Sequence, residues 1–81
     1  MYVFVHVREK VIKLSCGDGT QSISWLGNAA MVFYDSTLGK KYGSPVAVRK
    51  EGGVACDPNG RVCDTLDDNQ HVFAELDESI V

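Results

Sequence analysis

This 81-residue chain has only three cysteines and two prolines and has no long apolar run. Its three cysteines are an odd and sparse set, which excludes a disulfide framework and favours a reducing, intracellular compartment. No apolar stretch approaches the roughly 20 residues that a membrane-spanning helix needs. The opening "MYVFVHVREK" is not a signal peptide, because its apolar stretch is short, alternates in character and meets charge at Arg8.

The sequence also lacks the motifs that hold phosphate groups. Residues 16–20 read "CGDGT", a glycine pair between an apolar run and a segment of helical spacing. They match neither Gly-x-Gly-x-x-Gly nor Gly-x4-Gly-Lys, and Asp18 would repel a phosphate. We interpret the two glycines as backbone freedom where a strand turns into a helix.

Metal-binding and catalytic patterns are missing as well. Cys56 and Cys63 lack the close spacing of a zinc site, and His6 and His71 lie far from them in sequence. Cys16 has no base that can be placed beside it, so we interpret it as a small buried residue. The aspartates after residue 56 do not follow the calcium-loop pattern. We therefore predict no metal, no cofactor and no enzymatic activity.

Two strands and a hairpin are predicted at the start of the chain. Val3, Val5 and Val7 alternate with other residues, which is typical of a strand with one buried face. Residues 11–15 form a second β-rich run, with Ile12 and Leu14 on one face and Val11 and Lys13 on the other. The short polar break at 8–10 predicts a hairpin, although the favoured Asn-Gly signal is absent.

A helix is predicted over "ISWLGNAAMVFY", capped by Thr20 or Ser22 and ended by Gly39. Trp25 and Met31 fall beside its apolar stripe. We interpret the aromatic residues of this segment as core and not as a platform for stacking bases. The stripe consists of Ile23, Leu26, Ala30, Phe33 and Tyr34.

The rest of the chain predicts further strands. They cover 45–50, a short 54–56 and 72–76, with a turn or single helical turn over 62–69. The order predicts one α+β domain over 1–81 with the β-grasp (ubiquitin-like) fold, a mixed sheet with one main helix packed on one face. In this arrangement the second and fourth strands are the sheet edges.

Charge is distributed unevenly along the chain. Residues 1–50 carry seven basic and three acidic side chains, a net +4, whereas residues 51–81 carry one basic and eight acidic, a net −7. The acidic total argues against nucleic-acid binding. A basic edge and an acidic edge on one small body suit a head-to-tail contact, which propagates as a filament unless it closes a ring. A merely solvated surface with segregated charge is the alternative.

The chain resembles a known family over nearly its whole length. The segments are "MYVFVHVREKVIKLSCGDG", "ISWLGNAAMVFY" and "CDTLDDNQHVFAELDE", and the most specific part is "CGDG" followed by Leu26, Ala30 and Tyr34. They resemble the N-terminal oligomerisation domain (conserved region one) of the partitioning-defective three family of Par polarity scaffolds. The resemblance implies a β-grasp domain, cut from a longer cytoplasmic scaffold, that self-associates front to back into filaments at the cell cortex or cell junctions. Membrane association would be indirect, through the rest of the scaffold.

The resemblance also implies two faces. The basic face falls on Val11 and Lys13 with Arg8 and Lys10 beside them, and Arg49 and Lys50 are additions from the third strand. The acidic face falls on Asp67, with Asp57, Asp64 and Asp68 near it. The family has an apolar residue where Lys13 stands, so we expect a more polar and more salt-sensitive contact here. A monomeric ubiquitin-like module that binds another partner, such as a microtubule surface, is the alternative.

Overall fold

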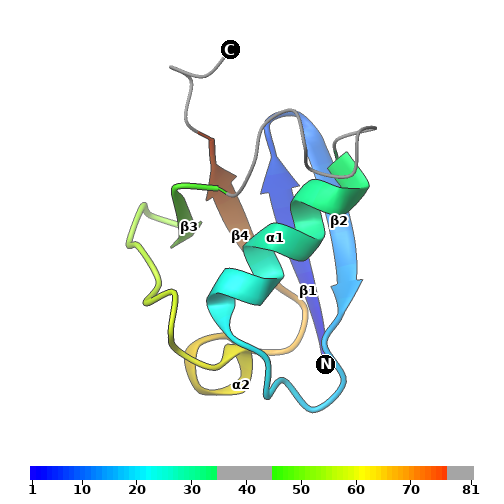
Figure 1. Ribbon diagram of the computed structural model, residues 1–81, viewed down its shortest axis with the longest axis vertical. Coiled ribbons are helices and arrows are strands. Elements are labelled where there is room, and N and C mark those ends of the chain that lie inside the picture. Colours follow the sequence, from blue (N-terminus) through cyan, green and yellow to red (C-terminus); the bar gives the residue numbers. More distant parts are fainter. Residues whose placement is uncertain (35–44, 77–81) are drawn as a thin grey trace.

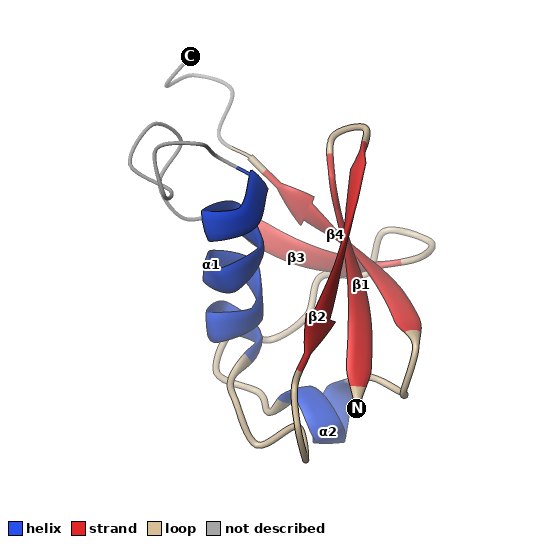
Figure 2. Ribbon diagram, turned by 90° about the vertical axis from the view of Figure 1, so that its right-hand side faces the viewer, coloured by secondary structure: helices blue, strands red, loops and turns tan. Residues whose placement is uncertain are grey.

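A four-stranded mixed sheet with one main helix on one of its faces forms the molecule (Figures 1 and 2). The computed structural model describes residues 1–34 and 45–76. The strand order is β2-β1-β4-β3, with β1 parallel to β4 and the other two pairs antiparallel. This confirms the predicted α+β, ubiquitin-like arrangement. The elements are β1 (Tyr2–Val7), β2 (Lys10–Ser15), α1 (Ile23–Tyr34), β3 (Ala47–Lys50), α2 (Val62–Thr65) and β4 (Gln70–Glu75).

The β1–β2 hairpin forms as predicted. Val3, Val5 and Val7 are fully buried beneath α1 because their alternation places them all on the covered face of the sheet. Val7 pairs with Lys10, which leaves a two-residue connection. Arg8 takes a φ of 55°, the left-handed sign that the first position of such hairpin turns requires. The chain therefore makes the turn without the Asn-Gly signal.

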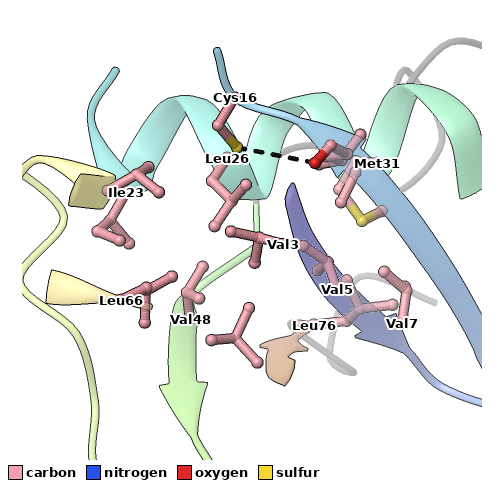
Figure 3. Packing of buried hydrophobic residues seen from close by; sticks show 14 residues of the cluster. Val3, Val5, Val7, Cys16, Ile23, Leu26, Met31, Val48, Leu66 and Leu76 are labelled. Carbon is pink, nitrogen blue, oxygen red and sulfur yellow. Dashed lines mark hydrogen bonds between the residues drawn. The ribbon is translucent and has the colours of Figure 1, made fainter. Parts of the chain in front are cut away.

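The face that α1 presents to the sheet differs in part from the prediction. Its buried residues recur at helical spacing, and several are visible in the core in Figure 3. Met31 is only 1% exposed, whereas Phe33 is 70% exposed and Trp25 is 38% exposed. Phe33 follows Met31 by two positions, about 200° around the helix, so both cannot face the sheet. The predicted core roles of Phe33 and Trp25 are therefore wrong; the buried set is Ile23, Leu26, Gly27, Ala30 and Met31.

Ser22 begins the helix. Its Oγ accepts the backbone N–H of Trp25 at 3.0 Å, whereas the Thr20 hydroxyl donates to Asp18 Oδ1 at 3.1 Å. The first helical N–H groups, of Ile23 and Ser24, donate to the carbonyls of Gly60 and Pro58. The start of α1 is thus bound to the loop that precedes α2. The predicted end at Gly39 lies outside the described residues.

The sheet edges are β2 and β3. The second predicted strand is an edge as expected, whereas the predicted fourth strand, 54–56, does not form, so that β3 takes the other edge. Parallel pairing with β1 places β4 inside the sheet. β3 begins at Ala47, later than predicted, and residues 54–56 form no strand. They make one isolated bridge between Arg49 and Ala55, because the chain has just turned through Gly52 and Gly53 at φ near 90°. The helical turn predicted within 62–69 is α2.

The "CGDGT" segment is a strand-to-helix turn, in agreement with the interpretation of its glycines. Gly17 and Gly19 take φ values of 57° and 78°. Gly19 is buried, and its carbonyl accepts the N–H of Cys63 at 2.8 Å, which joins this turn to α2. A Cβ on Gly19 would lie 2.7 Å from Cys63 Cβ. The second glycine therefore serves a close backbone approach as well as a left-handed conformation.

Candidate functional site

Lys13 and Val11 project from the face of the sheet that α1 does not cover. Ile12 and Leu14 alternate with them and pack toward α1, as predicted. Val11 is 52% exposed. The ammonium of Lys13 lies 4.5 Å from the centre of the Tyr2 ring and 5.8 Å from that of Phe4. Among the described residues, Lys13 has no carboxylate partner.

Lys10 lies on the other side of β2. It pairs with Val7, which faces α1, and its ammonium is 5.6 Å from the centre of the Tyr34 ring at the end of that helix. Arg8 occupies the exposed turn between the two strands. The basic residues of the hairpin therefore flank β2 on both sides and do not share one face.

The two basic residues of β3 belong to the opposite edge of the sheet. Arg49 is in register with Phe73, and its Nε donates to Glu75 Oε2 at 2.9 Å while Nη1 donates to the Gly53 carbonyl at 3.0 Å. Lys50 follows Arg49 and so points to the other face of the strand. β1 and β4 separate both residues from β2. Arg49 and Lys50 therefore do not join Lys13 in a single basic patch.

The four predicted acidic residues differ in what their carboxylates already bind. Asp68 Oδ1 accepts the N–H of Tyr2 at 2.7 Å, Asp64 pairs with Arg61 at 2.9 Å, and Asp57 Oδ1 accepts the N–H of Asn59 at 2.9 Å. All four residues are exposed. Of these four carboxylates, only that of Asp67 has no hydrogen-bond or ionic partner among the described residues. Asp67 is thus the acid of this set most available to another molecule.

A cluster of aromatic and histidine side chains lies on β1 and β4, on the sheet face opposite α1. The sequence analysis did not predict this cluster. His6 Nε2 and His71 Nδ1 are 2.7 Å apart and share a hydrogen bond. His71 stacks on Phe4 at 4.7 Å between ring centres, and His6 on Phe73 at 4.5 Å. The alternation of Phe4 and His6 between buried valines was the available signal. Parallel pairing of segments 65 residues apart brings these rings together.

The three cysteines occupy different environments. Cys16 is buried, with its Sγ directed to the Leu14 carbonyl (Figure 3), Cys56 is half-buried and Cys63 is exposed. Burial raises the pKa of the Cys16 and Cys56 thiols above their ordinary value. These two thiols therefore stay protonated at neutral pH. Within residues 1–34 and 45–76 no three histidine, cysteine or acidic side chains gather as metal ligands, and no helix there is long and apolar enough to cross a membrane.

Together these features define a small ubiquitin-like α+β domain with an exposed lysine on an edge strand and an exposed aspartate before a central strand. The family described as the N-terminal of Par3 and HAL proteins matches residues 1–80, and the chain belongs to this family. This confirms the resemblance drawn from the sequence. Membership in this family makes the chain a Par3-type polarity scaffold domain. The family is of the scaffold type and is not an enzyme family. A comparison with curated proteins gave no match.

Proposed function

We propose that this chain is a self-association domain of a longer polarity scaffold, in which Lys13 of one copy contacts Asp67 of the next. The observation that carries the proposal is the pairing state of these two side chains. Both are exposed, and neither has an ionic partner among the described residues. They lie on different elements, so the contact joins unlike surfaces and propagates head to tail.

The position of β2 supports such a contact. In the described part of the chain β2 pairs with β1 alone, so its outer edge can offer backbone hydrogen bonds to a neighbouring copy. Val11, beside Lys13 on the same face, adds exposed apolar surface. An exposed ion pair contributes only about 0–1 kcal/mol. The proposed contact therefore combines ion pairing, strand pairing and apolar burial, and a high local concentration at the cell cortex or a junction multiplies it.

The other predicted residues take supporting parts in this proposal. Arg8 and Lys10 add positive charge near β2, whereas Arg49 and Lys50 act from the far edge of the sheet. Asp57, Asp64 and Asp68 add negative charge to the acidic side of the contact. Asp57 and Asp64 bind within their own segments, whereas Asp68 binds the Tyr2 N–H at the start of β1. The domain acts without catalysis or a cofactor, and membrane association is indirect, through the rest of the scaffold.

Reversing one charge at a time tests the proposal. Lys13→Asp and Asp67→Lys should each stop growth of large species in sedimentation velocity. An equimolar mixture should form a discrete dimer, because each variant keeps one intact face. Glu51→Lys is a matched control, since it reverses an exposed acid in the turn after β3, at the sheet edge opposite Lys13 and on a different segment from Asp67, and it should assemble like the parent. If both charge reversals assemble like the parent, the proposed contact is wrong.

A monomeric binding module for a polyanionic partner, such as the microtubule surface, is the second candidate. It is favoured by the exposed lysines on both sides of β2. On this alternative the parent chain stays monomeric at every concentration. It sediments with microtubules, Lys13→Asp does not, and Asp67→Lys still does.

A further inference from the structure

We infer that Tyr2 is a positioning residue for Lys13 and directs its ammonium toward a carboxylate of the partner copy. This inference rests on the proposed self-association and identifies what tunes it. The Tyr2 ring centre lies 4.5 Å from Lys13 Nζ, well within the distance at which a cation is attracted to an aromatic face. Phe4 is a second ring at 5.8 Å. We call these two rings the aromatic seat of Lys13.

Strand register places the seat beside Lys13. Phe4 is directly opposite Lys13 across the hairpin, and Tyr2 is opposite Ser15, so Tyr2 is the diagonal neighbour of Lys13 on the same face. Diagonal neighbours are within reach of aromatic and long side chains. The alternation that buries Val3 and Val5 therefore also presents both rings beneath the lysine.

The backbone of Tyr2 and the ring of Phe4 are both held in place. The N–H of Tyr2 donates to Asp68 Oδ1, and its carbonyl accepts the N–H of Asn69, each at 2.7 Å. Phe4 stacks on His71 with an angle of 10° between the rings, and His71 is bonded to His6. The seat is thus anchored to β4 and to the turn before it. Rings carried on a strand that is anchored in this way limit the positions that the lysine chain can take.

The seat orders the lysine without neutralising it. A free lysine loses much rotamer freedom when it joins an ion pair, and ordering it beforehand lowers that cost of association. The rings carry no net charge, so the positive charge of Lys13 is not balanced by them. Arg49 differs, because its charge is already balanced by Glu75. Lys13 therefore stands ready for an outside carboxylate.

A single-interface dimer tests the inference. One half carries Asp67→Lys and keeps the lysine face, and the other carries Lys13→Asp and keeps the acidic face. Tyr2→Leu in the first half should raise the dissociation constant about 2- to 5-fold, the range expected from an exposed cation–ring contact. The same substitution in the second half should leave it unchanged, because no lysine remains at position 13. Isothermal titration calorimetry at low salt measures both.

Two further variants separate positioning from a general structural effect. Tyr2→Phe keeps the ring and should bind like the parent half. With Lys13→Met in the first half, Tyr2→Leu should no longer change the dissociation constant.

The possible failures are distinguishable. If the two starting halves do not associate, the proposed self-association is overturned and the inference with it. If the halves associate, three results would overturn the inference about Tyr2 and leave the self-association intact. Tyr2→Leu could leave the dissociation constant unchanged, could raise it equally from either half, or could still raise it when position 13 is Met.

Discussion

At the residue scale, aspartates from one short acidic stretch have different tasks. Asp64 and Asp68 are four positions apart, yet one pairs with Arg61 while the other holds the start of β1 through the Tyr2 N–H. Asp67, between them, keeps its carboxylate available among the described residues. The sequence identified the acidic stretch. Which acid keeps an unpaired carboxylate depended on loop geometry that residue type does not determine.

The two glycines of "CGDGT" also differ from each other in their surroundings, and this difference is testable. An alanine at either position would take a left-handed φ, which costs about 1–2 kcal/mol. At Gly17 the new Cβ has no atom within 4 Å, whereas at Gly19 it would meet Cys63 Cβ at 2.7 Å and Cys63 N at 3.0 Å. We expect Gly19→Ala to lower the free energy of unfolding by at least about 1 kcal/mol more than Gly17→Ala, because overpacking adds to backbone strain.

Urea unfolding of the parent and both alanine variants measures this effect. Gly17→Ala is the matched control, because it carries the left-handed backbone cost without the overlap. Equal unfolding midpoints for the two variants would contradict a special packing role for Gly19.

At the element scale, local pattern predicted β1, β2 and α1 well. Their periodicities reflect contacts that each element makes with a single neighbouring layer. The errors arose where the choice of buried face was finely balanced. Both Met31 and Phe33 are large and apolar, and the face of α1 that also carries Ile23 and Gly27 packed on the sheet, leaving Phe33 outside. Close approach at Gly27, where a Cβ would lie 3.2 Å from Val48 Cγ2, fits this choice.

The start of α1 offers a second test, because the structure shows which of the two predicted candidates, Thr20 or Ser22, caps the helix. Ser22→Ala removes the acceptor of the Trp25 N–H and should lower the free energy of unfolding by about 0.5–2 kcal/mol. Thr20→Ala is the control, since its hydroxyl bonds to Asp18 and not to the helix. Chemical denaturation followed by circular dichroism gives both values. A larger loss for Thr20→Ala would show that the cap is misassigned.

At the scale of the whole molecule, the parallel pairing of β1 with β4 determines which surfaces exist. It places β4 inside the sheet, leaves β2 and β3 at the edges and gathers the rings of Phe4, His6, His71 and Phe73 on the uncovered face. Figure 2 shows this face opposite α1. The lysine on edge strand β2 and the aspartate before β4 thereby come to lie two strands apart.

Salt should control assembly of the parent chain. The screening length falls from about 10 Å at 0.1 M salt to about 3 Å at 1 M, which weakens exposed ion pairs. Sedimentation velocity across a concentration series should therefore show large species at low salt that shrink at high salt. The Asp67→Lys variant should stay small in both conditions. A parent chain that remains monomeric throughout would contradict the proposed self-association.

The sequence by itself determined the fold class, the family, the two-sided pattern of the hairpin and the separation of charge along the chain. These features depend on residue type and on spacings of a few residues, which are readable without the fold. Only the tertiary structure decided which strands are edges, which face of α1 is buried, how His6 meets His71, and that Lys13 rests on Tyr2 while Asp67 keeps an available carboxylate. Each of these depends on pairing between segments distant in sequence, where packing of the whole core selects one arrangement among several that local preferences allow.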